Sequence, residues 1–325
     1  MKKRKLQAIV CGLLAAACVA AACLFAYPAL NAQTQPDPAR QAGILRLWHI
    51  DGFEGGKGSR ASFLSRAADV FEKESGMIVL VTVHTAESAR SALQAGDAPD
   101  LLSFGGDAAY IADFALPLRG LHFAAAETGG ETVAYPWCRG AYFLFSADGD
   151  FSGIDAENTL LSAGRGSCIQ AAAWSAGLRG AFTAETPAQA YVHWLGGKYR
   201  YLLGTQRDVQ RLLSRGAQFE ALPVGGYNDL LQYICICSGG QYAASLAFIQ
   251  HLLSDKVQSE LSQIGMLSVS CLVYTSGPLA SAQPFAAKSP HAFLSADGRR
   301  QFGLAAEAAL QGDENGAKNL QNFLI

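Results

Sequence analysis

The fold of this chain is decided by five consecutive sequence segments: ILRLWHID (44–51), GFEGGKGSR (52–60), ASFLSRAADVFEKESG (61–76), MIVLVTVH (77–84) and, after a polar stretch, DLLSFGG (100–106). The first, fourth and fifth segments are short apolar runs, typical of buried strands, and the third has apolar residues at helical spacing. Residues 87–95 predict a second, short helix. An alternation of strands and helices predicts right-handed crossovers and a parallel sheet, and therefore an α/β fold.

The rest of the chain predicts a second lobe. A chain of 325 residues is longer than one hydrophobic core usually supports. The aromatic segment 132–145, TVAYPWCRGAYFLF, is extended in character and is expected to cross between the lobes. Apolar residues at helical spacing predict helices over 242–253, 257–264 and 299–310.

The N-terminal residues predict export. Four basic residues, at positions 2–5, precede an apolar stretch that runs to Leu30 and is long enough to cross a bilayer. Residues 1–32 are therefore expected to be a signal peptide or an N-terminal membrane anchor. Residues 33–43 are polar, contain two prolines and are expected to be a linker.

Charge argues against a nucleic-acid partner. Without residues 1–32 the chain has 21 basic and 27 acidic residues, whereas nucleic-acid binding needs a basic surface. The five cysteines beyond the leader are an odd number, which does not indicate a disulfide framework. Cys235 and Cys237 would point to one face of a strand, as two small buried side chains.

No motif for a cofactor, a metal or catalysis is complete. GKGSRA (56–61) resembles a dinucleotide fingerprint, but an added loop separates it from the strand and His84 stands where an acid is expected. Its glycines and the following helix start would still offer backbone amides to a ligand. No nucleophile elbow, zinc helix or paired CxxC motif occurs. An enzyme would require the carboxylates of Asp51, Glu54 and Asp107 to converge.

Aromatic residues near strand ends could serve the core or a ligand. Trp48, Trp137 and Tyr142 are large enough to be ordinary core residues. Trp48 and Trp137 also neighbour His49 and Arg139 in the sequence, and an apolar ring beside polar groups suits a sugar. Both interpretations stay open on the sequence alone.

Three segments resemble bacterial extracellular solute-binding proteins, the sugar-type receptors of ATP-binding-cassette importers. LRLWHIDGFEGGKGSRASFLSRAADVFEKESG followed by DLLSFG is similar to the N-terminal lobe of that family. YPWCRGAYFLF is similar to its crossover, and FIQHLLSDKVQSELSQIGMLSV to its late helix pair. The resemblance covers most of residues 44–270. It implies a periplasmic-binding-protein-like fold with two α/β lobes, a hinge and an interlobe cleft.

The resemblance also implies lobe boundaries and ligand-binding residues. Lobe 1 would comprise 44–135 and 241–290, and lobe 2 would comprise 136–240 and 291–325, shortened relative to sugar receptors. The implied ligand-binding residues lie at strand-end turns and in the crossover: Trp48, Asp51, Arg60, Gly105, Asp107, Trp137, Arg139, Tyr142, Tyr227, Asn228 and Asp229.

The resemblance implies that the protein binds a solute and catalyses no reaction. A small hydroxylated solute, a carbohydrate, would bind in the cleft and be delivered to an ATP-binding-cassette permease. The protein would be a monomer on the extracellular face of the bacterial cytoplasmic membrane, held there by the N-terminal segment or secreted, without cofactor or metal. The alternatives are a membrane-anchored sensor or scaffold with the same fold, and an exported α/β enzyme.

Overall fold

The computed structural model describes residues 43–118, 126–128, 131–237, 239–285, 287–288 and 296–324. The expected leader and nearly all of the expected linker lie outside these residues. Within them, no helix combines the length and the apolar character needed to span a bilayer. The folded body begins at Ile44.

The first sheet contains the N-terminal strands. Its order is β2 (Ile78–Val83), β1 (Ile44–His49), β3 (Leu101–Gly105), β12 (Leu231–Ile236), β5 (Glu131–Arg139) and β4 (Ala126–Thr128). β1 pairs in parallel with β2 and β3, whereas β12 pairs antiparallel with β3 and β5. Helix α3 (Arg60–Ser75) leads from β1 to β2, and α4 (Ala86–Gln94) leads from β2 to β3, as the sequence predicted.

The second sheet is made from the middle of the chain. Its order is β10 (Glu220–Pro223), β6 (Tyr142–Ser146), β9 (Tyr201–Thr205), β7 (Thr159–Ser162) and β8 (Thr183–Glu185). β7 pairs in parallel with β8 and β9, and β6 pairs antiparallel with β9 and β10. The helices of this region are α5 (Ile169–Ser175), α6 (Pro187–Leu195) and α7 (Gln206–Ser214).

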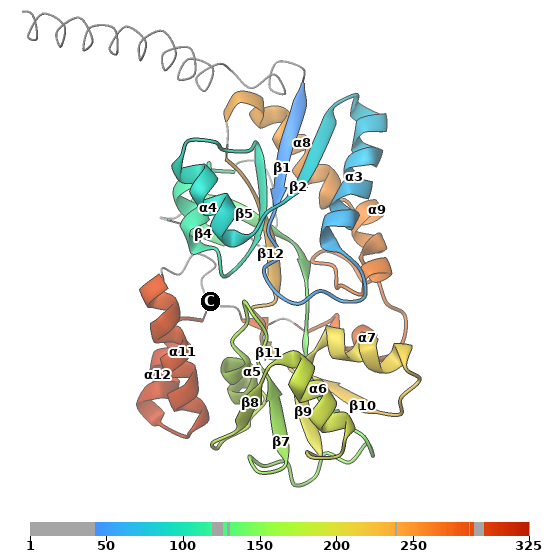
Figure 1. Ribbon diagram of the computed structural model, residues 1–325, viewed down its shortest axis with the longest axis vertical. Helices are drawn as coiled ribbons and strands as arrows, with labels where there is room; N and C mark the ends of the chain where they lie inside the picture. The colour runs from blue at the N-terminus through green and yellow to red at the C-terminus, as the bar shows by residue number, and fades with distance from the viewer. Residues whose placement is uncertain are drawn as a thin grey trace, which may run out of the picture. The chain divides into compact units, whose positions relative to one another are not determined.

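The remaining elements lie mostly in the C-terminal third (Figure 1). They are η1 (Ala109–Phe114), β11 (Gly226–Tyr227), η2 (Gly239–Gln241), α8 (Tyr242–Leu252), α9 (Asp255–Gln258), η3 (Ser259–Ile264), α10 (Pro278–Ala282), β13 (Ala287–Lys288), α11 (Ala296–Leu310) and α12 (Glu314–Asn322). The helix predicted over 257–264 is therefore a short α-helix continued by a 3₁₀ turn. It ends as expected at Gly265, which is left-handed with φ 69°.

Both faces of the first sheet are covered. Leu45 and Leu47 of β1 belong to a core cluster that also contains Phe63 of α3 and Phe248 of α8. The opposite face packs against α4 through a second buried cluster. Strands with both faces buried read as continuous apolar runs, which is the pattern that identified β1 and β3 in the sequence.

Strand β2 differs from its sequence prediction. The run 77–83 predicted a buried strand, but β2 forms the edge of the first sheet. Ile78, Leu80 and Val83 are 42%, 52% and 65% exposed, and only Val79 is fully buried. Local composition cannot distinguish a central strand from an edge strand, because that distinction depends on partners far along the chain.

The crossover between the sheets lies where the sequence placed it. β5 ends in the first sheet at Arg139, and β6 starts the second sheet at Tyr142. The expected lobe boundaries differ from the observed packing at two places. Residues 241–290 were assigned to lobe 1, but α10 packs on β10 and α7. Residues 136–240 were assigned to lobe 2. β12 (Leu231–Ile236) returns to the first sheet, between β3 and β5, since its partners are both there.

Candidate functional site

The chain passes from the first sheet to the second between β5 and β6, and two predicted ligand donors tie this crossing to other segments. Arg139 donates from Nε to the Ser268 carbonyl oxygen at 3.0 Å and from Nη2 to the Gln283 carbonyl oxygen at 2.5 Å. Asn228 donates from Nδ2 to the Gly140 carbonyl oxygen at 3.0 Å. Their donor groups serve backbone carbonyls, so in this structure both residues fasten the crossover instead of facing a ligand.

The turns that follow β1, β3 and β7 meet at a seam between the two sheets. Gly52 and Gly105 approach so closely that a side chain on either would overlap the other's backbone. Gly166 comes from the loop after β7 with φ 69°, and a Cβ there would overlap the Gly52 carbonyl oxygen. Three glycines therefore let backbone from both sheets touch. Gly105, a predicted ligand contact, has this packing role.

A buried polar network positions the turn after β1. The Ser103 hydroxyl accepts hydrogen bonds from Trp137 Nε1 at 3.0 Å and Gln232 Nε2 at 3.1 Å. Its own hydrogen therefore points to His49 Nδ1, 3.0 Å away, which makes Nε2 the protonated nitrogen of His49. Nε2 then donates to Asp51 Oδ1 at 2.9 Å. Burial lowers the pKa of His49, which favours this neutral form.

Asp51 and Arg60 form the outer part of the seam. Arg60 is buried and donates from Nε to Asp51 Oδ1 at 2.9 Å, while its guanidinium lies over the Phe53 ring. The hydrogen bond from His49, together with the Arg60 charge, lowers the pKa of Asp51 to about 2. These residues line a polar hollow of about 370 Å³, to which Arg207 of α7 also contributes. The hollow is thus lined from both sheets.

The glycine-rich loop between β1 and α3 packs on the end of η3. The Lys57 backbone N–H donates to the Ile264 carbonyl oxygen at 3.0 Å, and Gly56 and Gly58 pack closely on residues 264 and 265. Tertiary packing therefore uses the Lys57 N–H. The glycines do permit close backbone approach, but to the protein itself.

The inner part of the seam contains two acids and two arginines from four separate segments. Asp107, after β3, pairs with Arg165, from the loop after β7, at 3.6 Å. Arg299, on α11, interacts electrostatically with both Asp107 and Asp229. Burial raises the pKa of Asp107 and of Asp229 and lowers that of Arg299. Each charged form is therefore penalised by lost water.

Three buried polar atoms in this region lack a hydrogen bond of normal geometry: Asp107 Oδ1, Arg299 Nη2 and the Tyr227 hydroxyl, which lies beside the Asp229 carboxylate. Buried polar groups are normally satisfied, so a group of unsatisfied atoms needs an explanation. Tyr227 stacks on Tyr142 with ring centroids 6.2 Å apart. The Tyr142 hydroxyl donates to Asp229 Oδ1 at 2.6 Å.

Asp229 is fixed from a second side. Its Oδ2 accepts the backbone N–H of Cys168 at 2.7 Å, immediately before α5. This bond joins the turn before β12 to the loop after β7. The predicted residues Asp107, Tyr142, Tyr227 and Asp229 are thus brought into one region of the seam, together with Arg165 and Arg299.

Both tryptophans are core residues in this structure. Trp48 is 4% exposed and stacks on His84, with the ring centroids 4.3 Å apart. Trp137 is fully buried and stacks on Phe63, with the ring centroids 5.8 Å apart. Neither ring offers a surface to a ligand, because a residue before a strand end still lies between the packed layers.

The three carboxylates that an enzyme would need are separately engaged. Asp51 bonds Arg60, Asp107 pairs with Arg165, and Glu54 pairs with Arg207 at 3.1 Å. Among the described residues, no cluster of His, Cys, Asp and Glu could hold a metal ion. Cys235 in β12 and Cys237 directly after it have their sulfur atoms 3.7 Å apart, packed in or against the core.

Sequence reasoning missed Arg165, Gly166 and Arg299. Arg165 and Gly166 follow a short strand in a glycine-rich region, which is the kind of turn that carries ligand groups. Arg299 had no local signal, because it reaches the seam from a helix more than 60 residues beyond the nearest predicted site residue.

Comparison with known proteins identifies the fold of this chain but no relative in sequence. No family model matches the chain, and no curated protein matches it in sequence. The solved maltose-maltodextrin binding protein of Alicyclobacillus acidocaldarius superposes with a TM-score of 0.59 and 12% identity, over 86% of this chain and 98% of that one. The chain has the two-lobed fold of the solute-binding proteins.

Other solute-binding proteins of this fold differ in what they bind. Iron-bound HitA from Pseudomonas aeruginosa has a TM-score of 0.54 at 13% identity, over 86% of this chain and 99% of that one. A receptor described as binding GABA has a TM-score of 0.54 at 14% identity, over 82% and 97%. Because maltodextrin, iron and GABA are all bound on this fold, the ligand has to be argued from the seam.

Proposed function

We propose that this chain is an extracellular solute-binding protein that captures a small, neutral, hydroxylated solute, a carbohydrate, between its lobes. The observation that carries the proposal is the group of unsatisfied polar atoms on Asp107, Tyr227 and Arg299. A carboxylate oxygen accepts, a guanidinium nitrogen donates, and a phenol does either. A solute hydroxyl can serve all three, since it donates one hydrogen bond and accepts two.

Charge balance favours a neutral solute over an ion. The seam holds the acids Asp107 and Asp229 and the bases Arg165 and Arg299, whose formal charges cancel. A site for iron would need a surplus of anionic ligands, and a site for an anion would need a surplus of cations. The rings of Tyr142 and Tyr227 are buried and stack on each other, so their part in the seam is to position hydroxyl groups beside Asp229.

Closure would follow from contacts on both sides of the seam. Asp107 belongs to the first sheet's turns, whereas Arg165 comes from the second sheet's β7 loop. A solute that bonds both sides favours the arrangement in which they meet, because it has more contacts there. Residues 1–32, as signal peptide or anchor, would place the body outside the cytoplasmic membrane, where an ATP-binding-cassette permease would receive the solute.

A thermal-shift panel tests this function. Glucose, maltose, maltotetraose and xylotriose are compared with GABA and a ferric salt, each at millimolar concentration. A sugar bound with 100-fold excess over its Kd stabilises the fold by about 2.7 kcal/mol, a shift of several degrees. The carbohydrate proposal is rejected if GABA or iron raises the melting temperature and no sugar does.

A matched pair of variants places the binding at the seam. Asp107→Asn removes the charge at an unsatisfied buried carboxylate, and Asp113→Asn removes one at an exposed position on η1. We expect the first to weaken binding of the active sugar about tenfold or more, as a charged hydrogen bond is lost, and the second to leave it unchanged. If Asp107→Asn and Asp113→Asn bind the sugar with equal affinity, the binding site does not include Asp107.

A further inference from the structure

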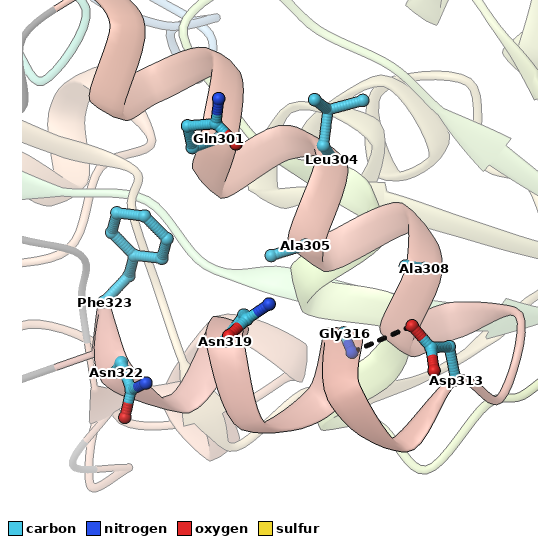
Figure 2. Close-up of a pocket in the computed structure, with 9 residues that line it drawn as sticks. All are labelled: Gln301, Leu304, Ala305, Ala308, Asp313, Gly316, Asn319, Asn322 and Phe323. Atoms are coloured by element: carbon cyan, nitrogen blue, oxygen red, sulfur yellow. Dashed lines mark hydrogen bonds between the residues drawn. The ribbon is translucent and has the colours of Figure 1, made fainter.

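Arg299 reaches the seam from a hairpin of two helices near the C-terminus. α11 and α12 pack against each other, with Gly316 so close to Ala308 that a side chain there would overlap it. Asp313 caps α12 by accepting the Gly316 N–H at 3.0 Å (Figure 2). The hollow drawn in Figure 2 lies between these two helices and does not include Arg299. The hairpin is therefore internally braced.

The hairpin is fixed to the second sheet's side of the seam. α11 packs on α5, and the Gly180 N–H donates to the Leu310 carbonyl oxygen at 2.8 Å. Phe302, one turn after Arg299 and so on the same side of the helix, stacks on Tyr227 at 6.3 Å. This stack continues to Tyr142, the partner of Asp229. The guanidinium of Arg299 is thereby held beside the seam's acids.

The bonding of Arg299 is nevertheless incomplete. Among the described residues it forms no ion pair with Asp107 or Asp229, although both carboxylates act on it electrostatically. Its Nη2 is buried without a hydrogen bond, and so is Asp107 Oδ1. An arginine that served only to neutralise the acids would gain by pairing directly with one of them. An unsatisfied donor and an unsatisfied acceptor that act on each other electrostatically are together complementary to a hydroxyl, which accepts and donates.

We propose that Arg299 contacts the bound solute, donating from Nη2 to a solute hydroxyl that in turn donates to Asp107, so that the C-terminal hairpin forms a wall of the site. This inference rests on the proposed function and extends it to a segment that carries no predicted ligand residue. The same hydroxyl would then join the first sheet's turn to the hairpin. Loading the site would therefore also hold α11 in place.

The first test uses the empty protein. Arg299→Met keeps the length and apolar stem of the side chain and removes a buried group that makes no bond through Nη2. The matched control is Arg300→Met, the next residue on α11, which is exposed and pairs with Asp297 at 3.0 Å. We expect both variants to melt within about 2 °C of the wild type, or Arg299→Met to melt higher. A fall of more than about 5 °C for Arg299→Met alone would assign the residue to structure and overturn the proposal.

The second test is calorimetric titration with glucose, maltotetraose and xylotriose. For a sugar that binds the wild type, we expect Arg299→Met to weaken the affinity tenfold or more, Arg300→Met to retain it, and Arg299→Lys to restore part of it. Wild-type affinity in Arg299→Met would refute the contact while leaving the proposed function intact. If no sugar binds the wild type, the carbohydrate function fails, and the empty-protein melting temperatures still decide whether Arg299 is structural.

Discussion

At the scale of single residues, His49 shows how burial assigns a role that the sequence leaves open. The ring is fully buried between Ser103 and Asp51, and both of its nitrogens are bonded. A serine, a histidine and an aspartate in line resemble a catalytic relay. The Ser103 hydroxyl is buried, however, and accepts from Trp137 and Gln232, so it has no access to a substrate. The relay instead orients the turn that begins at Asp51.

The protonation of His49 predicts how stability depends on pH. Its pKa is lowered in the folded state from 6.5 because burial disfavours the cation, so below pH 6.5 the unfolded chain binds a proton that the folded chain resists. Stability should therefore fall as the pH decreases from 7 to 5. In His49→Gln, urea midpoints should vary less over this range, although stability at pH 8 drops by about 1–3 kcal/mol as Ser103 loses its acceptor. Parallel curves for variant and wild type would contradict this prediction.

At the scale of elements, the crossings between the sheets depend on side chains that bond backbone. Arg139 sits at the end of β5 and bonds two carbonyls that follow η3 and α10. Burial lowers the pKa of its guanidinium, so those two bonds offset a desolvation cost. The Arg139 hydrogen bonds therefore join the crossing segments in addition to the covalent chain.

Loss of the two hydrogen bonds from Arg139 should lower the free energy of unfolding. Arg139→Met leaves the Ser268 and Gln283 carbonyl oxygens without their charged donor, and we expect a loss of roughly 2–3 kcal/mol in urea unfolding. Arg300→Met, at an exposed position, should change stability by less than about 0.5 kcal/mol. Similar values for the two variants would show that the crossing does not need Arg139.

The exposed edge strand β2 allows a second prediction at this scale. Leu80 is 52% exposed at the sheet edge, and lysine at edges discourages pairing between molecules. Leu80→Lys should change stability by less than about 0.5 kcal/mol and lower the light scattering of concentrated samples. Val79→Lys, one residue away but buried, should instead destabilise by several kcal/mol. A large loss from Leu80→Lys would mean that β2 is covered in solution.

At the scale of the whole folded body, the seam between the sheets is set by backbone contact. Gly166 lies against Gly52, and Glu54 and Arg207 pair beside it across the same seam. These contacts hold the turns of the two sheets together. A residue with a side chain at position 166 would act as a wedge.

Gly166→Ala should open the seam. Its control is Gly197→Ala, which has a similar φ of 74° but no neighbour that a Cβ would meet. Both variants should lose about 1 kcal/mol through backbone strain, and Gly166→Ala should lose more through overlap. Solution scattering should give a larger radius of gyration for Gly166→Ala alone. Identical scattering from the two variants would show that the contact does not limit the approach of the lobes.

Local patterns predicted the elements of this protein well and its site unevenly. The turns that contain Asp51, Asp107 and Asp229 follow or precede strands, and strand ends can be predicted from the sequence; the structure brings these turns to the seam. Trp48 and Trp137 were assigned to a ligand because ring chemistry says nothing about which layer covers the ring. Arg299 comes to the seam from a distant helix, and no periodicity in the sequence signals that position.

By itself, the sequence determined the alternation of strands and helices over residues 44–105, the α/β class and the point at which the chain passes from one sheet to the other. These follow from side-chain spacing over a few residues, which local sterics and hydrophobic burial enforce. Only the tertiary structure decided that β2 is an edge strand and that Arg139 and Asn228 donate to backbone carbonyls. It also brought Arg299 close enough to Asp107 for an electrostatic interaction. Such facts depend on distances between residues far apart in the chain, which are set by packing of the complete molecule.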